Sequence, residues 1–192
     1  AEGCSPIYKD GSMVSLPISD DLEGFNSYKD TFYKNKSFEK LFNELHGIEP
    51  TLRNLGAHLD PDLSKDSKKR LSDWKPNFGQ SSGAQGKLKK EGIAKGDLFL
   101  FFGRFSQFDF DYDESFDARR NKGKGEIHCF FGWLQTEQPL DAKYISNKPW
   151  LDDHPHRAHS TYKKHKENRI YISTDSLSLD SQISGAGHFK KY

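Results

Sequence analysis

The chain has 192 residues, a formal net charge of +1 and only two cysteines, Cys4 and Cys129. This length fits one domain, and the near-neutral charge excludes binding to nucleic acid through a global excess of basic residues. Two cysteines cannot form a disulfide framework, and no apolar run is long enough to span a membrane. We therefore expect one domain over residues 1–192, without membrane association, in the reducing cytoplasm.

The N-terminal part predicts short extended segments and then a helix. Asp10-Gly11 between apolar pairs is typical of a hairpin turn. Residues 37–46 predict a helix with Ser37 as its N-cap and Gly47 at its C-terminal end. The buried stripe of this helix has helical spacing and comprises Phe38, Leu41, Phe42 and Leu45.

Residues 61–78 are charged and contain proline. They predict either an exposed loop or short helix, or a contact with backbone phosphates. The glycine-rich segment 79–88 then leads into a short helix that ends near Gly92. This segment does not fit a P-loop, because Ser81 stands at the first glycine position and Leu88 replaces the serine or threonine.

Two strands are predicted in the second half of the chain, at residues 97–105 and 126–136. The continuous apolar run of the first strand indicates burial on both faces, and Gly103 indicates a bulge or a close approach. Residues 106–125 between them turn from acidic to basic, do not fit a calcium loop, and predict a mobile hairpin insertion.

The C-terminal part predicts another strand at 168–174 and a glycine-flanked turn at 185–189 that places either a backbone N–H or His188 near a pocket. Together these elements predict an α+β domain. It would have a curved mixed or antiparallel sheet, of which a PUA-like barrel is one form, and a few short helices.

Two histidine-rich clusters are the strongest functional signal. One contains His58, Asp60 and Asp62, and the other contains His154 and His156; each surrounds a proline. Proline stiffens the chain around it, so alternate side chains share a face. Ionisable groups are costly to bury unless they are paired or bind a metal, so the clusters are either solvated loops or parts of one site.

Several motifs along the chain resemble those of the third family of nucleotide modification associated domains. The matching pieces are Ser5-Pro6-Ile7, Asp10-Gly11, Leu16-Pro17-Ile18, His58 to Asp62, Gly79-Gln80, Gly83 to Gly86, Gly96 to Gly103, Gly132 to Gln135, His154 to His156 and Gly185 to Gly187. The resemblance implies a role in DNA base hypermodification, in phages and bacteria, and DNA or a nucleotide as partner. It also implies a further N-terminal strand ahead of the Ser-Pro segment.

One hypothesis is a DNA base or nucleotide-modifying enzyme. His58, Asp60 and Asp62 would supply a base and its orienting carboxylates, and His154 and His156 would converge on them. Arg104 would neutralise a phosphate. A divalent metal is an open alternative, because imidazoles and carboxylates suit zinc, manganese or iron; its ligands would be His58, Asp60, His154 and His156.

The other hypothesis is a non-catalytic, PUA-like module that binds modified bases. Such a reader needs an aromatic surface for stacking and amides that read base edges. Trp133 or Trp74 would stack, and Gln80 and Gln85 would read the base. A structural partner of other proteins in a modification pathway is a third alternative, and the oligomeric state stays open.

Overall fold

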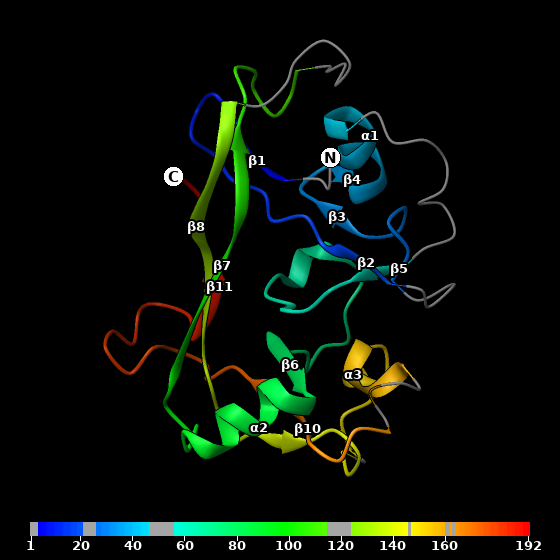
Figure 1. The fold of residues 1–192 in the computed structure, drawn as a ribbon, viewed down its shortest axis with the longest axis vertical. Helices are drawn as coiled ribbons and strands as arrows, with labels where there is room; N and C mark the ends of the chain where they lie inside the picture. Colours follow the sequence, from blue (N-terminus) through cyan, green and yellow to red (C-terminus); the bar gives the residue numbers. More distant parts are fainter. Residues whose placement is uncertain are drawn as a thin grey trace.

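The computed structural model describes residues 4–20, 26–46, 56–114, 124–145, 147–159, 162 and 164–192. Its largest sheet is curved and mixed, with the strand order β1-β7-β8-β11 (Figure 1). These strands are β1 (Ser5–Ile7), β7 (Leu98–Gln107), β8 (Lys124–Gln135) and β11 (Ala186–His188). β1 runs parallel to β7, and the other pairs are antiparallel. The predicted α+β class with a curved sheet is confirmed.

The two predicted central strands are confirmed as β7 and β8, but burial of β7 on both faces is wrong. Leu100 and Phe102 are 47% and 67% exposed, whereas Phe99 and Phe101, which alternate with Leu100, pack against the core. The reason is that only one face of this sheet is covered. The pairing register shifts between Phe101 and Phe102, which gives the bulge predicted near Gly103.

A second sheet lies against the covered face. It has the order β6-β10-β9, formed by β6 (Asn77–Ser81), β10 (Asn168–Ile172) and β9 (Leu140–Asp141). Aromatic rings join the two sheets: the centroid of Phe78 lies 5.1 Å from that of Phe101, and Phe99 lies 4.9 Å from Tyr171. The predicted short helix is α2 (Ser82–Lys90), which follows β6 directly and stops before Gly92 at φ +76°.

The N-terminal part forms a separate layer around helix α1 (Phe38–His46). Its small sheets pair β2 (Ile18–Asp20) with β5 (Gly56–His58), and β3 (Phe32–Tyr33) with β4 (Lys36–Ser37). The predicted cap is confirmed, because the Lys40 amide donates to Ser37 Oγ at 3.2 Å. The predicted stripe packs in the core, and Gly47 lies outside the described residues.

The predicted hairpin insertion is described only at its two ends. At the first end, Phe108, Phe110 and Tyr112 are buried in the core around α1. Residues 115–123, which would form the tip, lie outside the described part of the chain. The structure therefore shows how this segment is anchored.

Two predicted turns had different outcomes. The Asp10-Gly11 hairpin is confirmed: Ile7 and Met13 pair across it, and Gly11 has φ +81°. The turn predicted at 185–189 is wrong, because this segment is strand β11, paired with β8. Gly187 permits the pairing, since a Cβ there would lie 2.7 Å from the Trp133 indole.

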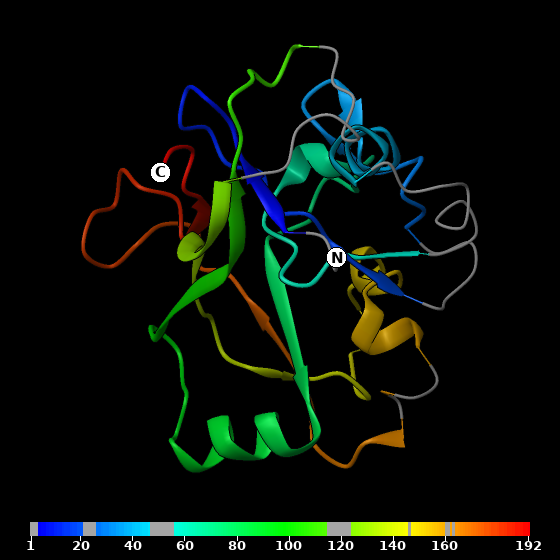
Figure 2. The same cartoon turned by 45° about the horizontal axis from the view of Figure 1, so that its top comes forward.

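Further short helical elements within the described ranges are η2 (Lys65–Ser67), η3 (Pro149–Leu151) and α3 (Pro155–Ala158). Helix α3 lies beside β6, the strand that crosses the middle of the molecule (Figure 2). Among the described residues, no helix is long and apolar enough to cross a membrane.

Candidate functional site

Asp60 is held against strand β6. It follows β5 by two residues, and its carboxylate oxygen Oδ1 accepts a hydrogen bond from the Gly79 amide at 2.8 Å. Its side chain is 5% exposed, so the carboxylate is almost completely removed from water. The second oxygen, Oδ2, faces two histidines.

The His-Pro-His segment positions those histidines from the other end of the chain. Pro155 begins helix α3, which suits its fixed φ, and His154 is the N-cap. The cap bond runs from the His156 amide to His154 Nδ1 at 3.1 Å. Both His154 and His156 are 4% exposed. The two histidines are therefore oriented by the local geometry of a helix start.

The two clusters of the sequence meet at Asp60. His156 Nε2 lies 3.2 Å from Asp60 Oδ2, and His58 Nε2 lies 3.8 Å from the same oxygen. The three atoms all lie within 4.8 Å of one another, an arrangement that could hold a metal ion. We call these three residues the His/Asp cluster; His154 lies beside it but outside this ligand group.

Asn168 at the start of β10 fixes the tautomer of His156. Its side-chain NH2 donates to the carbonyls of His156 and Tyr162, at 2.9 and 3.1 Å. The amide oxygen of Asn168 therefore faces His156 Nδ1, at 2.8 Å. Because that oxygen can only accept, Nδ1 carries a proton and donates. The Tyr162 ring stacks on the His156 ring at 4.3 Å and completes its confinement.

Gly79 allows the histidines to approach the sheet. A Cβ at this position would lie 2.4 Å from His156 Cδ2 and 2.7 Å from His154 Cε1. Both carbons are bonded to an Nε2 atom, so these two edges of the rings lie close to the same point. The site requires glycine here because of its missing side chain.

The electrostatics of the site follow from burial and from these contacts. Burial alone would raise the pKa of Asp60, but the neighbouring His156 and His58 imidazoles outweigh it and hold that pKa below its usual range. Burial lowers the pKa of His154 to about 3, although Asp60 opposes the shift. His154 is therefore neutral, and because its Nδ1 accepts a hydrogen bond, its proton is on Nε2.

His154 Nε2 has no hydrogen-bond partner within the described part of the chain. A buried donor without a partner costs about 1–3 kcal/mol. The position next to the His/Asp cluster thus offers one unused hydrogen-bond donor.

Asp62 lies outside the His/Asp cluster and is engaged by Arg70. The Arg70 guanidinium donates to Asp62 Oδ1 at 2.6 Å, and the two side chains are 8% and 10% exposed. Burial raises the pKa of Asp62, and Arg70 acts against that shift. Lys68 pairs with Asp153 and is likewise mostly buried. The basic run 65–70 therefore places two of its cations in the interior.

The other residues considered from the sequence are distributed over the fold. Gln85 is buried and accepts from the Tyr171 hydroxyl, and Gln80 accepts from the amide of Ser81. Trp133 packs on Phe189 and donates to the Ser184 carbonyl, while Trp74 lies under Arg70. His188 is in β11, next to Gly132. None of these contacts joins them to the His/Asp cluster.

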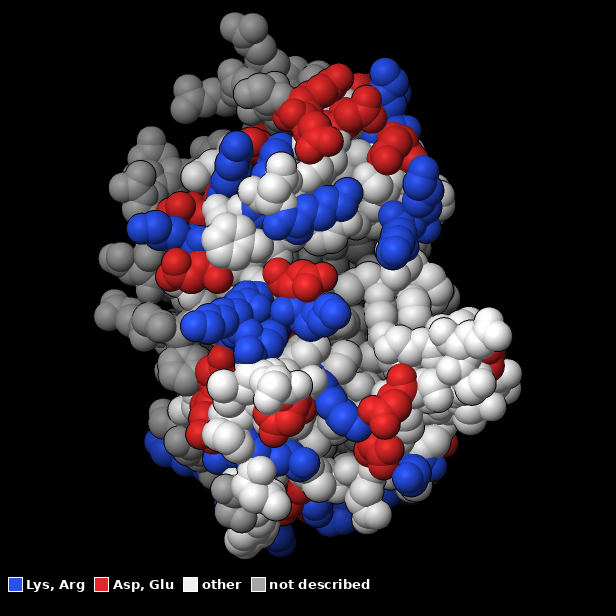
Figure 3. Space-filling view, turned by 180° about the vertical axis from the view of Figure 1, so that it is seen from behind, with Lys and Arg blue, Asp and Glu red and all other residues white. Residues whose placement is uncertain are grey.

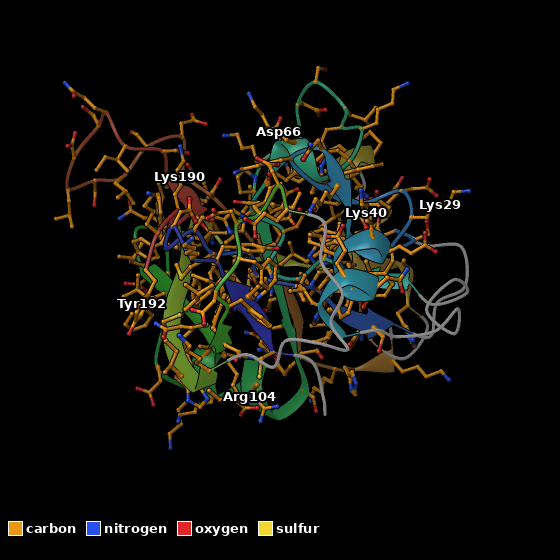
Figure 4. The ribbon with its side chains drawn as sticks, turned by 90° about the horizontal axis from the view of Figure 1, so that it is seen from above. Lys29, Lys40, Asp66, Arg104, Lys190 and Tyr192 are labelled. Atoms are coloured by element: carbon orange, nitrogen blue, oxygen red, sulfur yellow. The ribbon has the colours of Figure 1, made fainter. Side chains whose placement is uncertain are left out.

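Arg104 is on β7 and pairs with Glu126 at 3.4 Å. Figure 4 shows Arg104 and Asp66 of η2 on opposite sides of the molecule. Because η2 lies between Asp62 and Arg70 in the chain, Arg104 is on the side of the molecule opposite to this segment.

A pocket of about 570 Å³ lies beside the site, with His156 and Asn168 in its wall. Its other lining residues are Ala142, Lys143, Asp152, Arg157 and Ala158. Arg157 pairs with Asp152 at 2.9 Å, and Lys143 is exposed. Elsewhere, acidic and basic side chains alternate over the surface seen in Figure 3.

Four residues of the site were missed from the sequence: Asn168, Tyr162, Lys143 and Arg157. Asn168 was assigned only as the start of a strand, and Lys143 stands in a segment without a motif; Arg157 directly follows the His-Pro-His segment but was given no role. No local pattern distinguishes them, because their role arises from contacts between distant segments.

The comparisons with known proteins give one match. The model of the family described as nucleotide modification associated domain 3 matches residues 1–192, the whole chain. No curated protein and no solved structure matches it. The chain therefore belongs to the nucleotide modification associated domain 3 family.

Proposed function

We propose that this domain modifies a nucleotide base in DNA, and that the reaction takes place where the His/Asp cluster meets the pocket beside it. One observation carries the proposal: His156 belongs both to the buried cluster and to the pocket wall. Clustered ionisable groups in low dielectric at a pocket are typical of catalytic sites. The description of the family, nucleotide modification associated domain 3, supports a nucleotide as the substrate.

The pocket suits a nucleotide in size and charge. Ligand pockets commonly measure about 300–1,000 Å³, and this one is about 570 Å³. Lys143 and Arg157 on its wall are the residue types that contact phosphates. Asp152 pairs with Arg157, so Lys143 is the cation of the wall without a carboxylate beside it in the lining. A base would then lie toward the cluster, and His154 Nε2 would donate to an oxygen or nitrogen of the bound molecule.

The test is expression of the full chain in bacteria, followed by mass spectrometry of the nucleosides from total DNA. Cells supply the co-substrates, so an in vitro mixture need not be guessed. We expect an altered nucleoside with the wild type and at least about a 100-fold loss with Asp60→Asn, which keeps the side-chain shape but removes the charge. His128→Ala changes an exposed histidine on β8 and should match the wild type.

An unchanged nucleoside profile with the wild type would contradict the proposal that the domain is an enzyme that modifies a base. Binding of modified oligonucleotides by that same protein, weakened by Lys143→Ala, would then assign the pocket to base recognition without turnover.

A further inference from the structure

We propose that His58, Asp60 and His156 bind one divalent first-row transition-metal ion through Nε2, Oδ2 and Nε2. This metal site rests on the proposed function, because it is the same site, and the metal would be the cofactor there.

The distances are close to those of a metal centre. Two ligand atoms that are each about 2.1 Å from one ion lie roughly 3.0–3.4 Å apart. Asp60 Oδ2 lies 3.2 Å from His156 Nε2 and 3.8 Å from His58 Nε2. Two imidazoles and one carboxylate with further positions open are the ligand set of non-haem Fe2+ sites, and imidazole also suits zinc.

The hydrogen bonds of His156 indicate a cation between the ring and the carboxylate. Asn168 holds the proton on Nδ1, so a neutral His156 presents the lone pair of Nε2 to the lone pairs of Asp60. Such a contact at 3.2 Å is repulsive unless a positive ion or a second proton lies between the atoms. A ligating histidine commonly donates its other N–H to a carbonyl oxygen, which is the role Asn168 plays here.

The hydrogen bonding of the Asp60 carboxylate also favours a metal ligand at Oδ2. Asp60 Oδ1 accepts from the Gly79 amide, which leaves Oδ2 to face both histidines. A single extra proton on His156 would satisfy one contact, whereas one metal ion satisfies His58, His156 and Asp60 together. Metal binding thus accounts for both contacts at Asp60 Oδ2.

His154 provides an independent observation. It is 4% exposed, and its Nε2 has no partner in the described structure. The adjacent ring atom Cε1 lies close to Gly79, as does Cδ2 of His156. A water or substrate atom on the metal would give this N–H an acceptor. His154 is therefore a positioning residue and not a fourth ligand.

The test uses the full chain without a histidine tag. The protein is stripped with a chelator and titrated with Co2+, whose visible absorption reports the ligands, and Fe2+ and Zn2+ are then used as competitors. We expect one equivalent per chain, with a 100-fold or greater loss of affinity in Asp60→Asn and in His58→Ala. His128→Ala should bind like the wild type, and Asn168→Ala should bind about 10–100-fold more weakly.

Folding is monitored by circular dichroism in each variant. If the ligand variants do not fold, the wild-type Tm decides: a rise with Co2+ that also occurs in His128→Ala supports the site. Substoichiometric metal that dialyses away, or equal binding by Asp60→Asn and wild type, overturns the proposal in favour of a protonated His156–Asp60 pair. Metal binding without any altered nucleoside would contradict the proposed function and leave the metal site intact. An altered nucleoside without metal binding would contradict only the metal site.

Discussion

The His156 ring packs directly on the backbone of Gly79 in β6, so the site has no room for a side chain at residue 79. A Cβ on residue 79 would lie 2.4 Å from Cδ2 of His156. Since His156 is also held by Asn168 and stacked on Tyr162, its ring cannot move aside without losing these contacts.

Gly79→Ala should therefore destabilise the fold by about 1–3 kcal/mol, as expected for overpacking in a rigid interior. Urea unfolding measures the change. Gly86→Ala is the matched control: it lies inside α2, and a Cβ there meets nothing within 4 Å. Because alanine favours a helix interior over glycine, this control should gain about 0.5–1 kcal/mol. Equal effects at the two positions would contradict the close contact.

The one-sided burial of β7 predicts a large and a small loss of stability for substitutions of two phenylalanines of that strand. Phe105 is 0% exposed, and Phe105→Ala should cost about 3–5 kcal/mol in the free energy of unfolding. Phe102 is 67% exposed and faces Phe130 across the strands. Phe102→Ala should therefore cost only about 0.2–1 kcal/mol. A loss at Phe102 as large as that at Phe105 would show that a partner covers this face.

The buried pair Arg70–Asp62 predicts a non-additive double mutant. Arg70→Met leaves the Asp62 carboxylate buried without its guanidinium and should cost about 3–5 kcal/mol. Asp62→Asn removes the charge but keeps an acceptor for Arg70. In the double variant no uncompensated charge is left at this pair, so its loss should be smaller than the sum of the two single losses. Chemical denaturation of all four proteins gives the coupling energy, and strict additivity would argue against the ion pair.

His188 predicts a loss of stability in acid. Burial lowers the pKa of its imidazole below 6.5, although the Phe131 carbonyl opposes the shift. The unfolded chain therefore binds a proton at a higher pH than the folded chain. The stabilisation is complete above pH 6.5 and declines as the pH falls from there toward the folded pKa.

His188→Gln should remove this contribution. Unfolding free energies measured at pH 7.5 and pH 5.5 should fall more in the wild type than in the variant. Proton NMR titration checks the cause directly: the resonance absent from the variant should titrate below pH 6.5. If that resonance titrates at or above pH 6.5, burial is not controlling His188.

Much of the local structure could be predicted from short-range patterns. The helix α1, its Ser37 cap and the hairpin at Asp10-Gly11 depend on residues a few positions apart, and the structure confirms them. The wrong predictions concern contacts with distant segments. The exposed face of β7 reflects which side of the sheet is covered, and β11 is a strand because Gly187 can lie against Trp133.

The same division holds for the candidate site. The sequence already showed which ionisable residues are concentrated around two prolines, but not that His154 and Pro155 begin a helix. Long-range folding brings His58 and His156 to one oxygen of Asp60, while Asp62 is engaged by Arg70, and no local pattern indicated these pairings. The physical reason is that folding against β6 places these segments together, and burial then makes each charge depend on the partner it meets.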